Sequence, residues 1–135
     1  MEAAVVDLVK DLGKKYGTSM LFISHNLGLI LETCDRICVM YSGEAVETGS
    51  ISDVFDKMQH PYTQALLSAV PIPSPDLEAG REIKMLEGEI PSPLHPPEGC
   101  SFQNRCPVAK PKCSRISPET TKITTTHSVA CHLYP

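Results

Sequence analysis

Residues 18–50 read TSMLFISHNLGLILETCDRICVMYSGEAVETGS, and their hydrophobic pattern decides the fold class of the chain. The continuous apolar run at 19–24 is typical of a strand buried on both faces, and a helical pattern follows over residues 27–34. Two further short strands are predicted at 37–41 and 44–49, joined by a tight Ser-Gly turn. Helices that alternate with buried strands indicate an α/β fold.

Helical patterns flank this stretch on both sides. Apolar residues recur at helical spacing over residues 4–12. Ser50 or Ser52 is suited to cap a short helix after the second strand of the pair. Pro61 is suited to the start of another helix, over residues 62–70. The α/β pattern therefore continues beyond the quoted stretch in both directions.

The composition changes near residue 71 and divides the chain into three parts. Residues 1–70 carry the α/β pattern. Residues 71–99 contain seven prolines and are predicted to form an irregular connector, with room for one short strand around Ile83–Leu86. Residues 100–135 form a polar, cysteine-rich tail.

Four cysteines of the tail have the spacing C-x5-C-x6-C-x17-C: Cys100, Cys106, Cys113 and Cys131. From Gly99 onward the chain has few large apolar residues with which to build a core. A segment of this size buries too little apolar surface to offset its ordering entropy unless something crosslinks it. The four thiols therefore predict either two disulfides or one four-thiolate metal site.

The expected compartment favours the metal site. The N-terminal sequence MEAAVVDLVKDLGKKYG lacks the basic region and apolar block of a signal peptide, and no apolar run approaches the roughly 18 residues of a membrane span. We therefore expect a cytosolic chain without direct membrane insertion, in which thiols stay reduced.

The cysteine spacing does not identify the metal. Zinc and iron–sulfur clusters both accept four thiolates. The spacing lacks the C-x2-C knuckles usual in structural zinc sites, and it also lacks the cysteine run of bacterial ferredoxins. Zinc, an iron–sulfur cluster and an unliganded, disordered tail therefore all stay open at this point.

Charge and composition argue against nucleic acid as a partner. The net charge is −4, the isoelectric point is about 5.7, aromatic residues make up 5% of the chain and tryptophan is absent. These values disfavour binding through phosphates or through base stacking. The scattered basic residues form no polybasic block that would hold a membrane surface.

His25 is the second candidate for chemistry. It follows the strand predicted at 19–24 and precedes a predicted helix, where α/β proteins place groups that contact ligands. A neutral imidazole there can donate to a phosphate oxygen or orient a water. A lone histidine in a loop is more often only a polar turn residue, and the chain contains no P-loop, G-x-S-x-G or H-E-x-x-H motif.

The other cysteines and two of the other histidines have simpler interpretations. Cys34 and Cys38 are predicted to be small core residues rather than ligands. His127 and His132 flank Cys131 and are candidates for substitute ligands.

Four further polar residues are assigned to turns and to the surface. His60 precedes a proline and is predicted to be a turn or cap residue, whereas His95 is predicted to be solvated. Glu44 and Glu47 alternate on one strand and are predicted to lie on its exposed face.

The quoted stretch TSMLFISHNLGLILETCDRICVMYSGEAVETGS, followed by HPYTQALLSAVP and then by GCSFQNRCP and ACH, resembles one family closely. It is similar to the C-terminal portion of the ATP-binding subunits of dipeptide and oligopeptide ABC importers, of which nickel importers are close relatives. The resemblance covers essentially the entire chain. It implies that residues 1–70 are the C-terminal part of a P-loop NTPase-like ABC nucleotide-binding domain, followed by the proline-rich connector at 71–99 and a metal-binding tail at 100–135.

The resemblance also implies roles for the candidate residues. His25 matches the switch histidine, which would contact the γ-phosphate of ATP and help to position the attacking water. The cysteine tail of such importers implies a [4Fe-4S] cluster in preference to zinc, held by the four tail cysteines.

The resemblance places several ATPase motifs outside this sequence. The P-loop, the glutamine loop, the LSGGQ-type signature and the catalytic glutamate would all lie upstream of Met1. We therefore expect that ATP and Mg²⁺ bind only in the complete subunit, which would be an ATPase, and that this chain alone neither binds ATP tightly nor hydrolyses it.

The implied partners are a second ABC ATPase subunit and two transmembrane permease subunits, at the inner face of the cell membrane. A sheet edge left bare at residues 19–24 would favour self-association. The alternative is a stand-alone interaction or redox-sensing module, stabilised by zinc or by an iron–sulfur cluster.

Overall fold

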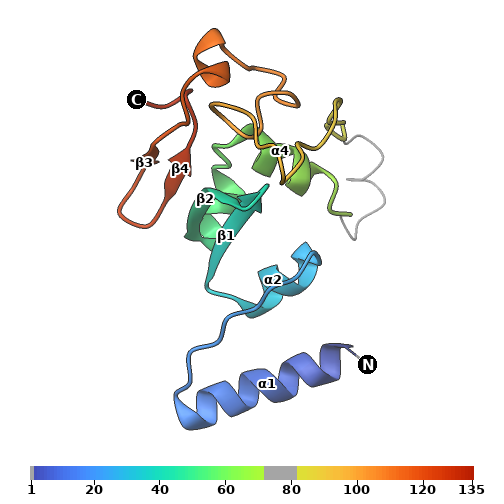
Figure 1. The fold of residues 1–135 in the computed structure, drawn as a ribbon. Helices are drawn as coiled ribbons and strands as arrows, with labels where there is room; N and C mark the ends of the chain where they lie inside the picture. The colour runs from blue at the N-terminus through green and yellow to red at the C-terminus, as the bar shows by residue number, and fades with distance from the viewer. Residues whose placement is uncertain (1, 72–81) are drawn as a thin grey trace. The chain divides into compact units, whose positions relative to one another are not determined.

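The computed structural model describes residues 2–71 and 82–135. The chain divides into two compact units, Met1–Asp35 and Arg36–Pro135, and each is described by itself. Figure 1 shows their helices and strands.

The first unit consists of two helices and the irregular segment between them. Helix α1 spans Glu2–Tyr16, and helix α2 spans Leu27–Thr33. Asn26 caps α2, because its side-chain oxygen accepts the Leu29 N–H at 3.2 Å. The two helices predicted from the sequence are therefore confirmed.

The strand predicted at residues 19–24 is not present in the structure. This segment has no regular secondary structure, and the side chains of Leu21 and Ile23 are 88% and 93% exposed. A buried strand exists only where neighbouring strands accept its backbone hydrogen bonds, and none of the strands in the described residues pairs with this segment. The prediction was wrong because an apolar run cannot supply its own partner strands.

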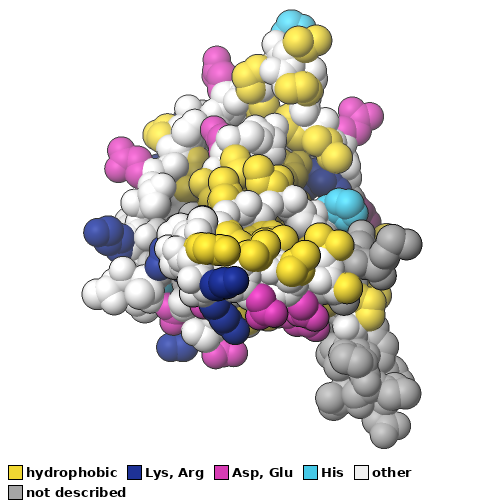
Figure 2. Space-filling model, turned by 90° about the horizontal axis from the view of Figure 1, so that it is seen from below, with side chains coloured by type: hydrophobic (Ala, Val, Ile, Leu, Met, Phe, Trp, Pro, Cys, Tyr) yellow, Lys and Arg dark blue, Asp and Glu magenta, His cyan; other side chains and the backbone are white. Residues whose placement is uncertain are grey.

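Helix α1 also presents apolar side chains outward. The exposed ones recur at helical spacing: Val5, Leu8, Leu12 and Tyr16. Figure 2 shows hydrophobic side chains gathered in a row with acidic and basic side chains at its margin. None of the described helices is long and apolar enough to cross a bilayer.

The second unit is built on one antiparallel sheet with the strand order β1-β2-β4-β3 (Figure 1). Its strands are β1 at Arg36–Tyr41, β2 at Glu44–Ser50, β3 at Thr120–Lys122 and β4 at Ser128–Ala130. The sheet thus joins a hairpin near the start of this unit to a hairpin of the cysteine tail. The α/β class is confirmed in this coarse form.

The turn between β1 and β2 matches the sequence prediction. Ser42 and Gly43 both have positive φ angles, 48° and 83°. Two-residue hairpin turns of this kind need positive φ at both central positions because only then does the turn follow the twist of the strands.

Two short helices follow β2 where the caps were predicted. Helix α3 spans Ile51–Asp56, and the hydroxyl of Ser50 accepts the Asp53 N–H at 3.1 Å. Helix α4 spans Pro61–Ser68, and its cap is His60, whose Nδ1 accepts the Tyr62 N–H at 3.1 Å. The cap role of His60 is confirmed, and Ser50 rather than Ser52 is the cap of α3.

The short strand predicted around Ile83–Leu86 is absent, since residues 82–87 have no regular structure. The Lys84 N–H instead donates to the hydroxyl of Ser68 at 3.0 Å. The cysteine-rich tail at 100–135 is irregular apart from β3, β4 and one 3-10 turn, η1, at Pro111–Ser114.

The core of the second unit is shared between its hairpin, helix α4 and the tail. Phe102, from the tail, is only 1% exposed and packs edge-on against Tyr41 of β1 at 5.0 Å between ring centroids. Tyr62 and His60 lie beside the same ring, each at 5.5 Å. The cysteine segment is therefore packed on the sheet through an aromatic side chain.

Candidate functional sites: the cysteine tail and the His25 loop

The four cysteines of the tail come from separate loops of the second unit. Cys100 follows the connector, Cys106 begins a turn, Cys113 lies in η1 and Cys131 follows β4. All of them carry free thiols, so neither of the two disulfides that the sequence allowed is formed. The backbone links two of these loops, because the Cys100 N–H donates to the Cys113 carbonyl oxygen at 2.8 Å.

Backbone N–H groups face the sulfur atoms. The Lys110 N–H donates to Sγ of Cys113 at 3.3 Å. The other three sulfurs each interact with the backbone N–H two positions later: Phe102 for Cys100, Val108 for Cys106 and Leu133 for Cys131. Such donors stabilise a thiolate and favour sulfur as an anionic ligand.

The surroundings of three of these thiols favour their protonated form. Burial raises the pKa of Cys100, and the nearby Cys113 and Cys131 sulfurs raise it further. The pKa values of Cys106 and Cys131 are raised in the same way, first by burial and then by neighbouring cysteines. A cation bound among the sulfurs would reverse this balance, because it would offset both the desolvation and the mutual repulsion of the thiolates.

The donor chemistry therefore suits a thiolate-bound metal, but the sulfurs do not enclose one point. Within residues 2–71 and 82–135, no three Cys, His, Asp or Glu side chains are grouped closely enough to hold a metal ion. The structure brings the four loops into one region without arranging their side chains as a finished ligand set.

The two histidines proposed as substitute ligands are engaged elsewhere. His127 is 1% exposed, and its Nε2 lies 2.7 Å from Oε1 of Glu47. His132 Nε2 lies 2.6 Å from the carbonyl oxygen of Ile116, to which it donates.

The prediction that Glu47 is exposed was wrong. Glu47 was expected on an exposed strand face, as Glu44 indeed is, but it is 1% exposed. Its two carboxylate oxygens accept the N–H groups of Gln59 at 2.8 Å and His60 at 2.9 Å in addition to His127. The reason is long-range: β4 pairs with β2 at Glu47, and the loop before α4 closes over its carboxylate.

The remaining cysteines depart in part from their expected core positions. Cys34 is half-buried at the end of α2, where burial raises the pKa of its thiol. Cys38 is exposed, because the alternation of β1 buries Ile37, Val39 and Tyr41 instead. His95 is exposed, as expected.

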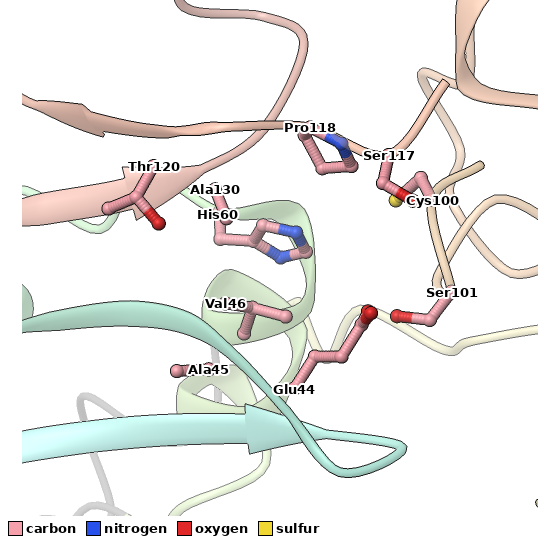
Figure 3. Close-up of a pocket in the computed structure, with 10 residues that line it drawn as sticks. All are labelled: Glu44, Ala45, Val46, His60, Cys100, Ser101, Ser117, Pro118, Thr120 and Ala130. Carbon is pink, nitrogen blue, oxygen red and sulfur yellow. The ribbon is translucent and has the colours of Figure 1, made fainter. Parts of the chain in front are cut away.

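A cavity of about 350 Å³ lies beside Cys100, between β2, the start of α4 and two loops of the tail. Figure 3 shows the ring of His60 pointing into this space, with Cys100 and Ser117 at one side. Burial lowers the pKa of His60 to about 4, so the ring is neutral near pH 7. Because Nδ1 accepts the Tyr62 N–H, the proton of the neutral ring is on Nε2.

His25 lies in the first unit, within the loop that ends at the cap of α2. Its side chain is exposed. The loop is shaped locally, since the Asn26 N–H donates to the hydroxyl of Ser24 at 2.9 Å. The helix predicted after His25 is present as α2, whereas the strand predicted before it is absent.

The chain is similar to ATP-binding proteins of oligopeptide transporters. A family model described as "Oligopeptide/dipeptide transporter, C-terminal region" matches residues 46–113. The chain is 47% identical over 131 residues to the oligopeptide transport ATP-binding protein OppF of Escherichia coli, covering 97% of this chain and 39% of that protein. It is 49% identical over 118 residues to OppF of Salmonella typhimurium, covering 87% and 35% of the two chains.

A third relative is matched over a similar share of its length. The putative oligopeptide transport ATP-binding protein YkfD of Bacillus subtilis is 46% identical over 134 residues, covering 99% of this chain and 41% of that protein. The chain thus spans about two fifths of the length of the curated relatives that it matches.

Proposed function

The chain belongs to the family of oligopeptide/dipeptide transporter C-terminal regions, and we propose that it acts as the C-terminal part of an ATP-binding subunit that energises peptide import. The observation that carries the proposal is the identity of 47% to OppF over 97% of the chain. An identity of this size over nearly every residue covers the His25 loop, the β1–β2 hairpin and the cysteine tail together.

His25 would act on ATP only within a complete subunit. An exposed imidazole at this loop is free to reach a phosphate oxygen, whereas the phosphate-cradling amides and lysine of a P-loop are not in this sequence. The chain by itself is therefore expected neither to bind ATP tightly nor to hydrolyse it. Its working partners would be a second ABC ATPase subunit and two permease subunits at the cytoplasmic face of the membrane.

Complementation tests this function. The chain is co-expressed with the upstream ATPase region of a relative in a bacterium that lacks its own subunit, and uptake of a labelled oligopeptide is measured. Restored uptake that His25→Ala abolishes, and that the matched exposed-histidine variant His95→Ala leaves unchanged, supports the proposal. No restoration by the folded, co-purifying pair contradicts it.

We propose further that Cys100, Cys106, Cys113 and Cys131 hold a [4Fe-4S] cluster, with zinc as the alternative. The support is chemical: four partly or fully buried thiols come from one region, and backbone N–H groups face their sulfurs. The cluster would bind as a group held by four thiolates and would crosslink the loops of a tail that has little apolar core.

Metal and sulfide analysis of protein purified without oxygen tests this assignment. Iron and acid-labile sulfide at about four each per chain would support the cluster. Zinc at about one per chain would favour the stand-alone structural module. The matched variants are Cys113→Ser, expected to lose the metal, and Cys38→Ser, expected to keep it because Cys38 lies on an exposed strand face outside the tail. Purified wild-type chain that holds neither iron nor zinc would contradict both the cluster and the zinc alternative.

A further inference from the structure

Gly99 lies where two segments of the cysteine tail cross at very short distance. Its φ angle is +76°, a conformation that strains any residue with a side chain. A Cβ atom at this position would lie 2.3 Å from the Cys113 carbonyl oxygen and 2.9 Å from the Arg115 nitrogen. Both obstacles are backbone atoms, which cannot turn aside as a flexible side chain can. Only glycine therefore permits this crossing.

The crossing holds two of the four cysteines. Cys100 is the residue after Gly99, and its N–H donates to the carbonyl oxygen of Cys113 at 2.8 Å. On the other side, the hydroxyl of Ser117 donates to the Gly99 carbonyl oxygen at 3.0 Å. The sulfur of Cys113 is in turn held by the Lys110 N–H. The backbone thus fixes Cys100 beside Cys113 without help from a metal.

We propose that Gly99 is the positioning residue of the cysteine site: the absence of its side chain lets the Cys100 segment lie against Cys113, and this contact sets the spacing of the two ligands. The inference rests on the metal-binding function proposed above. It goes beyond that function because it assigns the assembly of the site to a residue that carries no ligand atom.

A pair of glycine variants separates the crossing from backbone strain. Gly99→Ala introduces both the strain of a positive φ and the clash with Cys113. Gly43→Ala is the matched control, because Gly43 has a φ of +83° but no atom within 4 Å of its added Cβ. Both variants lose a left-handed glycine, and only the first forces the two cysteine segments apart.

Two readouts are taken on the full chain. The first is iron, sulfide and zinc content after anaerobic reconstitution. The second uses chelator-treated, metal-free protein, in which dibromobimane links two neighbouring thiols and peptide mapping identifies the linked pair. Circular dichroism and the thermal midpoint report whether each variant is folded.

For Gly99→Ala we expect metal affinity to fall by about 10- to 100-fold, the range typical of groups that orient ligands. Crosslinking of Cys100 to Cys113 should fall with it, whereas Gly43→Ala should match the wild type in both readouts. Equal crosslinking in Gly99→Ala and Gly43→Ala would overturn the proposal, and so would a wild-type chain whose Cys100 and Cys113 do not crosslink.

A milder variant covers the case in which Gly99→Ala does not fold. Ser117→Ala removes only the exposed hydroxyl that holds the Gly99 carbonyl, and a smaller loss of the same crosslink is expected. An unchanged crosslink in this variant would count against the proposal. If wild-type protein binds no metal, the metal-binding function fails by itself, and the crosslinking comparison still decides the role of Gly99.

Discussion

At the scale of single residues, Glu47 carries an unusual number of long-range contacts. Its buried carboxylate accepts the backbone N–H groups of Gln59 and His60 and the Nε2–H of His127, which lies 80 residues away in the sequence. Because the carboxylate serves three donors at once, its removal leaves two buried donors and one part-buried donor without this acceptor.

We therefore expect Glu47→Ala to destabilise the chain by about 3 kcal/mol, since each buried unsatisfied donor costs roughly 1–3 kcal/mol. The measurement is urea unfolding of the full chain. Glu44→Ala is the control, because Glu44 is exposed on the same strand and should change stability by less than about 0.5 kcal/mol. Equal effects of the two substitutions would contradict this account of Glu47.

His60 gives a prediction for pH. Burial lowers its pKa from 6.5 to about 4, so the folded state binds a proton less readily than the unfolded state. The stability that the neutral ring provides is complete above pH 6.5, and it is lost as the pH falls toward 4. The size of this loss is about 3 kcal/mol.

His60→Asn tests the prediction, because asparagine also caps helices but does not titrate. When the pH is lowered from 7 to 4.5, the urea unfolding midpoint of the wild type should decrease by more than that of the variant. His95→Asn, at an exposed position, should follow the wild type. A variant with the unchanged pH dependence of the wild type would show that another group is responsible.

At the scale of elements, the sequence correctly predicted turns and helix starts, which depend on residues close together in the chain. The β1–β2 hairpin was predicted from the Ser-Gly turn because glycine takes the positive φ that such a turn needs, and the starts of α3 and α4 were predicted from their cap residues. The segment at 19–24 failed because a strand requires partners. The tail strands β3 and β4 were not predicted either, since three-residue strands carry almost no pattern.

The cap of α3 provides a test at this scale. Ser50→Ala removes the acceptor of the Asp53 N–H and should cost about 1 kcal/mol. Ser52→Ala is the neighbouring control, because Ser52 is exposed and accepts no helix N–H, and it should cost less than about 0.5 kcal/mol. Chemical unfolding of the two variants gives the difference, and a larger cost for Ser52 would reverse the assignment of the cap.

At the scale of the second unit, the sequence located the candidate ligands but not their arrangement. The spacing placed four cysteines in one tail, whereas the crossing at Gly99 and the pairing of β4 with β2 depend on contacts far apart in the chain. The sequence suggested a tail that only a crosslink could order. The structure adds a second source of order, because the tail contributes Phe102 and Val129 to the core of the sheet.

This packing predicts what happens to the tail without metal. Phe102→Ala removes a ring that contacts Tyr41, Tyr62 and His60, and the loss should be about 3–5 kcal/mol. Hydrogen exchange of metal-free protein should then show faster exchange in β3 and β4, while metal-free wild type keeps both strands protected. Val108→Ala is the control, since Val108 belongs to the same tail but is half-exposed at 49%. If metal-free wild type already exchanges β3 and β4 as fast as an unfolded chain, the metal rather than the aromatic core orders the tail.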